Sequence, residues 1–222
     1  MNNLPRVRFA PSPTGLLHLG LARTALSNFL FAKQHNGKFL VRIEDTDSER
    51  SKKKHINQIC DTLKWLGLNW DEELTYQSEN SLTYNKFIKK LLDSDKAYRC
   101  FATKDELDSI REDSNSYHYT GIWRDREKKD IDEEINKGTS FTIRLKTPID
   151  GIIQYNDLIY GNITISNTEL DDFILFRSDG SPVYNFTNVI DDYIMGITHV
   201  IRGEDHIPNT PKQILIYNAL GF

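Results

Sequence analysis

The residues best suited to chemistry near the start of the chain lie in one stretch, Arg8-Phe-Ala-Pro-Ser-Pro-Thr-Gly-Leu-Leu-His-Leu-Gly20. It contains a short β-prone run, two prolines, a turn at Gly15 and the start of an amphipathic helix. That order of strand, tight loop and helix points backbone N–H groups and the positive end of a helix dipole at an anion. Ser12, Thr14 and His18 can each bond phosphate or nucleotide oxygens. The stretch therefore predicts a nucleotide-binding site.

A second polar group consists of the acids Glu44, Asp45 and Asp47, which directly follow an apolar run from Lys38 to Ile43. If that run is a strand parallel to the first, the acids and the opening loop share the carboxyl edge of the sheet. Ligands of open α/β sheets bind at that edge. A helix N-cap at Asp47 or Ser48 is the alternative, and it would account for one acid but not for three.

Two strands and an intervening helix must position these groups. Residues 18–36 have apolar side chains at the i, i+3, i+4 spacing of a helix, and residues 38–43 alternate as a strand does. A connection this short implies a right-handed parallel βαβ unit. Further apolar stripes predict helices over residues 49–66, with Cys60 on the packed face, and over residues 82–93.

The chain changes character from about residue 95 to 187, beginning with a highly charged segment. The predicted elements are helices at 103–112 and 125–137, strands at 140–145, 151–155 and 162–165, and a hairpin. The hairpin joins Phe173–Phe176 to Val183–Phe186 through Ser178-Asp-Gly-Ser181, since Asp-Gly between alternating apolar residues favours a tight turn. An antiparallel α+β segment after a βαβ unit predicts an inserted domain.

Residues 188–222 return to the order of strand, polar loop and helix. His199–Arg202 predicts a short strand, and Gly203–His206 predicts the loop. Asn209-Thr-Pro211 predicts the start of a helix that ends at Gly221. This second unit indicates the other half of a nucleotide-binding fold.

The composition is that of an ordinary globular protein, with 38% hydrophobic and 27% charged residues among 222. No apolar run approaches the ~20 residues that span a membrane, and the N-terminus has no signal-peptide core. The only cysteines, Cys60 and Cys100, suit a reduced compartment, so we expect a cytoplasmic protein without membrane association. The net charge of −4 does not indicate nucleic-acid binding. We interpret Lys52–Lys54 as a solvated helix face.

Four motifs, in order, resemble those of the bacterial-type glutamyl-tRNA synthetases, which are class I aminoacyl-tRNA synthetases. They are the opening stretch, Ile43-Glu-Asp-Thr-Asp47, Val189-Ile-Asp-Asp192 and Val200-Ile-Arg-Gly-Glu-Asp-His-Ile207. The resemblance covers essentially the whole chain. His18-Leu-Gly20 matches the start of the class I His-x-Gly-His element. Leu21 replaces the second histidine, a replacement often seen in this branch.

The resemblance implies an α/β fold, a Rossmann-like parallel sheet (the class I catalytic core) interrupted by an α+β connective insertion. Residues 1–94 would form the first half of the catalytic domain. Residues 95–187 would form the insertion that holds the tRNA acceptor end, and residues 188–222 would start the second half. The chain stops before a Lys-Met-Ser-Lys-Ser-like loop and anticodon-binding helices. We therefore expect a fragment that binds glutamate weakly and turns over ATP poorly.

The implied reaction joins L-glutamate to ATP, with Mg²⁺, to give glutamyl-adenylate and pyrophosphate. The glutamyl group then passes to the 2′-hydroxyl of the terminal adenosine of tRNA-Glu, and bound tRNA is normally needed before activation. The α-carboxylate attacks the α-phosphorus, so the enzyme mainly positions reactants and stabilises developing charge. The expected partners are L-glutamate, ATP and tRNA-Glu, and the expected active form is a monomer.

The resemblance also implies roles for single residues, with His18 and Gly20 as the catalytic pair. Arg8 and Arg202 would hold the glutamate carboxylates, because a guanidinium pairs with a carboxylate bidentately, and Glu44 would take the ammonium. The amino-acid pocket would also include Ala10, Ser12, Tyr184 and Asn188. The ATP side would consist of Ser12, Thr14, His18, Gly20, Glu204, Asp205 and His206.

Each role has a plainer structural alternative. An arginine at a strand end usually makes only a weak surface ion pair. Tyr184 in a hairpin would pack, and Glu44 beside Arg42 would form a structural pair.

Some members of the family carry a zinc ion in the insertion. Here Cys100 occupies the first ligand position, but Ala102, Trp123 and Asp125 stand near where the others would be. Too few ligands remain for tetrahedral zinc, so we predict no structural zinc.

Three alternatives stay open. A glutamyl-queuosine tRNA-Asp synthetase-like modifying enzyme shares the catalytic motifs but usually carries the zinc cysteines. A non-catalytic glutamate- or nucleotide-binding module would match a chain without the second signature loop. A generic nucleotidylyltransferase fits less well, because the Glu44–Asp47 acids and the Arg202 segment argue against it.

Overall fold

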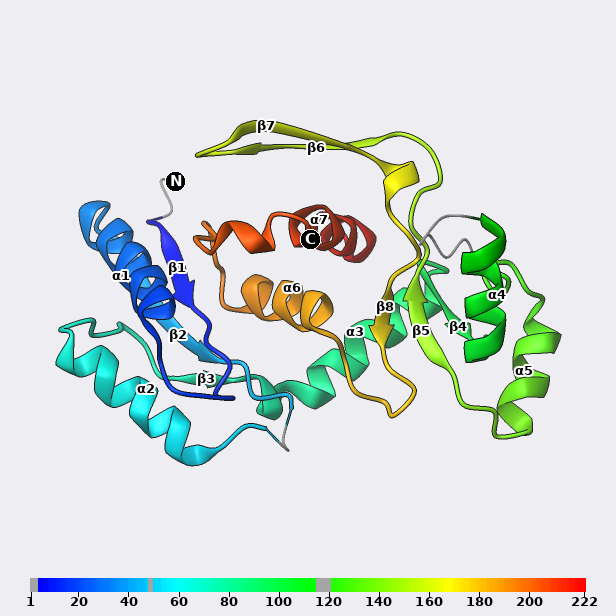
Figure 1. Ribbon diagram of the computed structural model, residues 1–222, viewed down its shortest axis with the longest axis horizontal. Helices are drawn as coiled ribbons and strands as arrows, with labels where there is room; N and C mark the ends of the chain where they lie inside the picture. Colours follow the sequence, from blue (N-terminus) through cyan, green and yellow to red (C-terminus); the bar gives the residue numbers. More distant parts are fainter. Residues whose placement is uncertain (1–3, 48–49, 115–120) are drawn as a thin grey trace. The chain divides into compact units, whose positions relative to one another are not determined.

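The computed structural model describes residues 4–47, 50–114 and 121–222, which fall into two compact units (Figure 1). The first unit contains Met1–Thr83 and Ile190–Ile207, and the second contains Tyr84–Val189 and Pro208–Phe222. Helix α6 (Tyr184–Ile194) begins in the second unit and ends in the first. No described helix is long and apolar enough to cross a membrane.

The first unit has the predicted parallel βαβ architecture. Its elements are β1 (Arg6–Phe9), α1 (Leu19–Gln34), β2 (Lys38–Ile43), α2 (Lys53–Trp65), β3 (Thr75–Tyr76), and the 3-10 turns η1 (Gln77–Asn80) and η3 (Glu204–His206). The strands lie in the order β1-β2-β3 and are parallel. Arg8 pairs with Leu40 and Phe9 with Val41. The short strand β3 was not predicted.

The two faces of this sheet differ in chemistry. One face is apolar and packs on α1 and α2 (Figure 1). Its core residues are Val7, Phe9, Phe39, Val41 and Ile43 from the strands, with Ala25, Ala32, Ile59, Leu63 and Leu68 from the helices and the loop after α2. Because side chains alternate along a strand, the opposite face carries Arg8 and Arg42, and both are buried. The sheet thus has an apolar face that stabilises the fold and a buried charged face.

The predicted strand at His199–Arg202 is wrong. The chain here approaches the free edge of β1, where the Thr198 amide donates to the Arg6 carbonyl at 2.9 Å. The ladder does not continue, because the Ile201 carbonyl instead accepts a hydrogen bond from the Asn28 side-chain amide on α1 at 3.0 Å. The segment is therefore extended and anchored but is not a strand.

The second unit contains an antiparallel sheet and a separate two-stranded ribbon, as an α+β segment should. The sheet has the order β4 (Ala97–Cys100), β5 (Thr142–Leu145), β8 (Ile174–Phe176), and the ribbon pairs β6 (Ile152–Asp157) with β7 (Gly161–Ser166). The helices are α3 (Ser81–Asp93), α4 (Lys104–Ser114), α5 (Lys128–Asn136) and α7 (Asn209–Leu220), with the 3-10 turn η2 (Asn167–Glu169) after β7. These four helices were predicted, whereas β4 and the start of α6 were not.

The predicted hairpin is only half right. The turn forms, since the Arg177 amide donates to the Ser181 carbonyl at 2.8 Å and Gly180 has φ 81°. The second arm is not a strand, because Tyr184 begins α6. The buried residues Phe186, Val189 and Ile190 recur at helical spacing, and a four-residue window is too short to show that period.

Helix α2 begins later than expected. The predicted start, residue 49, lies outside the described part of the chain, as does the alternative cap Ser48. Asp47 Oδ1 accepts from the Arg50 amide at 3.1 Å, and the N-cap of α2 is Lys52. Cys60 is half-buried on α2, and burial raises the pKa of its thiol, which favours a packing role.

Candidate functional site

The opening loop and the end of β2 meet at the carboxyl edge of the parallel sheet, as the sequence predicts. The Glu44 amide donates to the Pro11 carbonyl at 2.9 Å. The loop is also held to α2, because the Pro13 carbonyl lies 3.1 Å from His55 Nδ1. Pro11 and Pro13 are buried, whereas Ser12 and Thr14 between and after them are exposed. The prolines thus fix a loop that presents two hydroxyls to solvent.

Helix α1 starts directly after this loop, with His18 as its N-cap in an extended conformation. The His18 side chain makes no capping hydrogen bond, so the first helical N–H groups have no side-chain cap from that residue. A Cβ atom on Gly20 would lie 3.1 Å from the His18 ring. Glycine at this position leaves room for the imidazole beside the exposed helix terminus.

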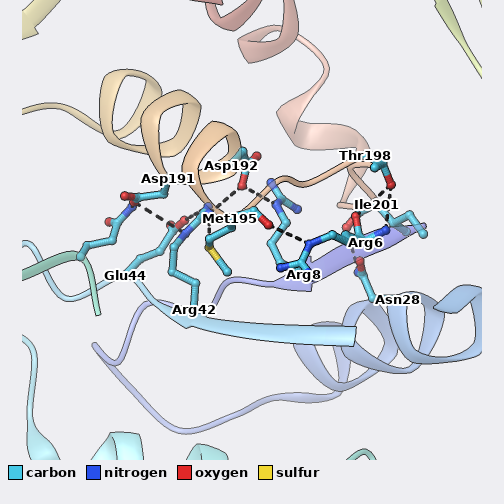
Figure 2. Close-up of polar contacts among 11 residues, drawn as sticks. Arg6, Arg8, Asn28, Arg42, Glu44, Asp191, Asp192, Met195, Thr198 and Ile201 are labelled. Carbon is cyan, nitrogen blue, oxygen red and sulfur yellow. Dashed lines mark hydrogen bonds and ion pairs between the residues drawn. The ribbon is translucent and has the colours of Figure 1, made fainter. Parts of the chain in front are cut away.

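A buried charged cluster lies on the polar face of the sheet beside this loop (Figure 2). Asp192 Oδ1 accepts from Arg8 Nε at 3.0 Å and from Arg42 Nη1 at 2.6 Å. Arg42 Nη2 donates to Glu44 Oε1 at 3.1 Å, and Arg42 Nε lies 3.8 Å from Asp191 Oδ2. The two arginines come from neighbouring strands, and the two aspartates come from the last turn of α6.

The charges in this cluster are stable because they compensate one another. Burial would raise the pKa of Asp192, but Arg8 and Arg42 outweigh it and hold the pKa below its usual range. Burial likewise opposes the charge on Arg42, but Asp192, Glu44 and Asp191 raise its pKa. Removing one partner of such a buried set leaves an uncompensated charge, which is strongly destabilising.

Asp191 extends the cluster to the chain after β3. Its carboxylate accepts from Gln77 Nε2 at 2.7 Å and from Asn80 Nδ2 at 3.1 Å. Asp45 also anchors this turn, by accepting from the Ser78 amide and hydroxyl. Two of the acids singled out in the sequence, Asp45 and Asp47, therefore have structural partners, Ser78 and Arg50.

The remaining predicted residues of the first unit follow the anchored segment at Thr198–Ile201. Arg202 is half-buried, Glu204 and Asp205 are exposed on η3, and His206 Nε2 lies 3.7 Å from Asp205 Oδ2. Hydrogen bonds to Arg6 and Asn28 hold the segment just before Arg202 (Figure 2). The first unit thus contains most of the predicted residues: Arg8, Ala10, Ser12, Thr14, His18, Gly20, Glu44, Arg202, Glu204, Asp205 and His206.

Tyr184 and Asn188 belong to the second unit, on the first two turns of α6. Tyr184 is half-buried and Asn188 is buried. The structural alternative placed Tyr184 in a hairpin strand, and this placement is wrong because Tyr184 begins a helix. The role of both residues stays a prediction.

The structural pair of Glu44 and Arg42, offered as an alternative from the sequence, is confirmed. Sequence reasoning missed the contact of Arg42 with Asp192 and the parts played by Asp191 and Asp192. A signal was present, because Arg42 interrupts the apolar run Phe39–Ile43 on the same alternation as Glu44. Two adjacent acids followed the apolar pair Val189-Ile190, which is unusual at buried positions. What the sequence lacked was any indication that these charges meet.

The region around Cys100, where the resemblance places the first zinc ligand of some family members, is packed with apolar side chains. Cys100 and Tyr98 are buried, and Ala102, Leu107 and Trp123 pack against them. Asp125 lies 3.3 Å from Lys146 Nζ. Among the described residues, no group of three or more His, Cys, Asp or Glu side chains is arranged to hold a metal ion. The absence of structural zinc stays a prediction.

Comparison with known proteins agrees with this geometry. Residues 5–222 match the family described as tRNA synthetases class I (E and Q), catalytic domain. A glutamate–tRNA ligase of Coprothermobacter proteolyticus is 56% identical over 98% of this chain and 48% of its own length. Glutamate–tRNA ligase 1 of Caldanaerobacter subterraneus subsp. tengcongensis is 52% identical over 97% of this chain and 46% of its own length.

A solved structure has the same fold. The crystal structure of a glutamate tRNA ligase from Elizabethkingia meningosepticum, in complex with its amino acid, matches with a TM-score of 0.90 and 39% identity. The match covers 99% of this chain and 47% of that one. The fold is therefore the Rossmann-like parallel core of class I synthetases, with an antiparallel α+β segment. The chain belongs to the catalytic-domain family of class I tRNA synthetases, and it spans about half the length of the relatives it matches.

Proposed function

We propose that this chain is the glutamate- and ATP-binding part of a glutamate–tRNA ligase. The observation that carries the proposal is the pairing of Arg8 and Glu44, one cation and one acid, through a buried network at the carboxyl edge of the sheet. An amino acid carries the complementary pair of charges. The similarity to glutamate–tRNA ligases over nearly the whole chain supports glutamate as that amino acid.

The glutamate side would use three charged residues. Arg8 and Arg202 would pair with the two carboxylates, and Glu44 would accept hydrogen bonds from the ammonium. Arg8 is held through Nε by Asp192, so its guanidinium has a fixed direction before substrate arrives. A neutral glutamine side chain would leave one guanidinium without its carboxylate, which accounts for discrimination against glutamine. Ala10, Ser12, Tyr184 and Asn188 complete the proposed pocket.

The ATP side would use the exposed loop and the start of α1. Ser12 and Thr14 offer hydroxyls, and His18 and Gly20 lie at a helix terminus that favours phosphate. Glu204, Asp205 and His206 on η3 are the proposed partners on the far side of the nucleotide. Mg²⁺ would arrive with ATP as part of the substrate and neutralise phosphate charge.

The chemistry then follows from alignment. The α-carboxylate of glutamate attacks the α-phosphorus of ATP, the bond to the bridging oxygen breaks, and pyrophosphate leaves. The helix terminus and His18 stabilise the charge on the phosphates during this step. The 2′-hydroxyl of tRNA-Glu then displaces AMP from the adenylate. In this proposal residues 95–187 hold the acceptor end, and the whole protein acts as a cytoplasmic monomer.

The test is calorimetric titration of this chain with L-glutamate and with L-glutamine. Saturable binding of glutamate at least tenfold tighter than that of glutamine is expected. Equal affinity for both, or no saturable binding of glutamate, would overturn the proposal. A charging assay of the full-length protein on separated tRNA-Glu, tRNA-Gln and tRNA-Asp distinguishes the ligase from a tRNA-modifying enzyme.

A further inference from the structure

Arg42 occupies the centre of the buried cluster but has no place in the proposed list of substrate contacts. Its side chain is 0% exposed. One guanidinium nitrogen binds Asp192 at 2.6 Å and another binds Glu44 at 3.1 Å. Full burial excludes Arg42 as a surface ion pair.

Arg42 is linked to both of the charged groups that the proposed pocket needs on this face. It contacts Glu44 directly, and it reaches Arg8 through a single carboxylate oxygen, Asp192 Oδ1, which both arginines share. Arg8, Arg42 and Glu44 project from the same face of the sheet, since β1 and β2 are in register with Arg8 opposite Leu40. One guanidinium is therefore linked to the cation proposed to bind a carboxylate and to the acid proposed to bind the ammonium (Figure 2).

We propose that Arg42 is a positioning residue for glutamate, which sets the directions of Arg8 and Glu44 before the substrate binds. This inference rests on the proposed function. Because the network is assembled before binding, no conformational entropy is lost in ordering Arg8 and Glu44 when the substrate binds, and the affinity is higher. Lysine cannot replace arginine here, because its ammonium is a single point donor and cannot hold two carboxylates in the fixed geometry of a planar fork.

The competing explanation is purely structural. Arg42 also joins β2 to the last turn of α6, so its loss would destabilise the fold whatever the substrate. Buried ion pairs are often no more stabilising than apolar residues of the same volume. A structural role predicts lower stability, with glutamate affinity unchanged in the molecules that remain folded. A positioning role predicts a selective loss of glutamate affinity.

The experiment compares Arg42→Lys with Arg6→Lys in the 222-residue chain. Arg6 is a matched control, since it lies two residues from Arg8 on the same face of β1 but pairs with Glu72 at the surface. Titrations measure L-glutamate and ATP separately. Arg42→Lys is expected to weaken glutamate binding at least tenfold, the range typical of residues that orient a ligating group, and to change ATP affinity less than twofold. Arg6→Lys is expected to leave both within twofold.

A second measurement needs no ligand. NMR of ¹⁵N-labelled arginine side chains reports hydrogen exchange at Arg8 Nε, which donates to buried Asp192. We expect a protected proton in the wild type and in Arg6→Lys, and fast exchange in Arg42→Lys. Arg42→Gln provides the same test if Arg42→Lys does not fold, because it removes the charge that Asp192 and Glu44 share and leaves the acceptor of Arg8 Nε in place.

The outcomes separate the two hypotheses. Wild-type chain that does not bind glutamate overturns the proposed function and this inference with it. If the wild type binds glutamate and the folded Arg42→Lys variant keeps both the wild-type glutamate affinity and the protection of Arg8 Nε, the inference alone is overturned. Equal losses for glutamate and ATP would also overturn it, since they indicate general structural damage.

Discussion

Asp192 in the first unit and Asp172 in the second are both buried and both bind arginine side chains, but they are surrounded differently. Asp192 is shared by two arginines from neighbouring strands. The Asp172 carboxylate binds Arg124 and otherwise accepts from neutral groups, the Tyr98 hydroxyl and the Thr147 amide and hydroxyl. The backbone carbonyl of Asp172 accepts from Arg144 Nη1 at 2.8 Å. The bonds to Asp172 close a loop against its own sheet, whereas those to Asp192 lead to Arg8 and Arg42 on the charged face, beside the proposed ligand-binding edge.

A buried aspartate–arginine pair can stabilise the fold or orient a side chain for ligand binding. A carboxylate with several local donors is fully satisfied and stabilises the fold. Asp192 instead joins two cations beside the opening loop, and one of these cations, Arg8, is proposed to bind substrate. We therefore expect changes at Asp172 to affect stability alone and changes around Asp192 to affect ligand binding as well.

The largest expected effect is on stability, from Asp172→Ala. This change leaves the guanidinium of Arg124 without its carboxylate and removes the acceptor for Thr147, so unfolding free energy should fall by about 3–5 kcal/mol. Urea unfolding measures it. Asp93→Ala, which removes an exposed pair with Lys89 in the same unit, is the control and should change little. A loss at Asp172 no greater than that of the control would refute the comparison.

The next effect is on binding, from Arg8→Ala compared with Arg124→Ala. Loss of a hydrogen-bonded charge pair with the substrate costs roughly 1.5–3 kcal/mol, so Arg8→Ala should weaken glutamate binding about 10- to 150-fold. Arg124→Ala should lower the melting temperature and leave glutamate affinity within twofold. Calorimetry under conditions where both variants are folded checks this, and similar affinities for the two variants would remove the distinction between the two aspartates.

A smaller effect concerns acid stability at the edge of the charged face. Glu72 accepts from Arg6 and Lys38, and these hydrogen bonds lower its pKa to about 2. Since the unfolded value is about 4.3, the stabilisation is present above that pH and is lost as the pH falls toward 2. The pair is partly exposed, so its contribution is below about 1 kcal/mol. The lowered pKa of Asp192 acts in the same direction.

Glu72→Gln isolates this contribution. The difference in unfolding free energy between pH 7 and pH 3 should become smaller in the variant, while glutamate affinity at pH 7 stays the same. Denaturant titrations at the two pH values measure it. An identical pH dependence in wild type and variant would show that the surface pair has no part in acid stability.

The smallest expected effect is that of metal removal. Tyr98, Cys100 and their neighbours form an apolar cluster. The Tyr98 hydroxyl donates a hydrogen bond to the Asp172 carboxylate. Dialysis against a chelator should therefore shift the melting temperature by less than about 1 °C, whereas removal of a structural zinc from a small domain often unfolds it. A clear drop in melting temperature, restored by zinc, would contradict the prediction.

Much of the fold was accessible from local patterns. Period-two alternation in Lys38–Ile43, helical spacing in residues 18–36 and the Asn209-Thr-Pro211 start each led to a correct element. The incorrect predictions concern short segments whose sequence pattern fits more than one conformation. Val183–Phe186 alternates like a strand but begins a helix, and His199–Arg202 is extended but finds a side chain, Asn28, in place of a strand partner.

The sequence by itself determined the parallel βαβ unit, the placing of Glu44 beside the opening loop and the family, because these depend on neighbouring residues and ordered motifs. Only the tertiary structure decided that Asp192 joins Arg8 and Arg42, across separations of 184 and 150 residues. The physical reason is that a buried charge is tolerated only where its partner arrives from elsewhere in the fold. Local patterns carry no information about that partner, and it is the partner that gives Arg42 its proposed role.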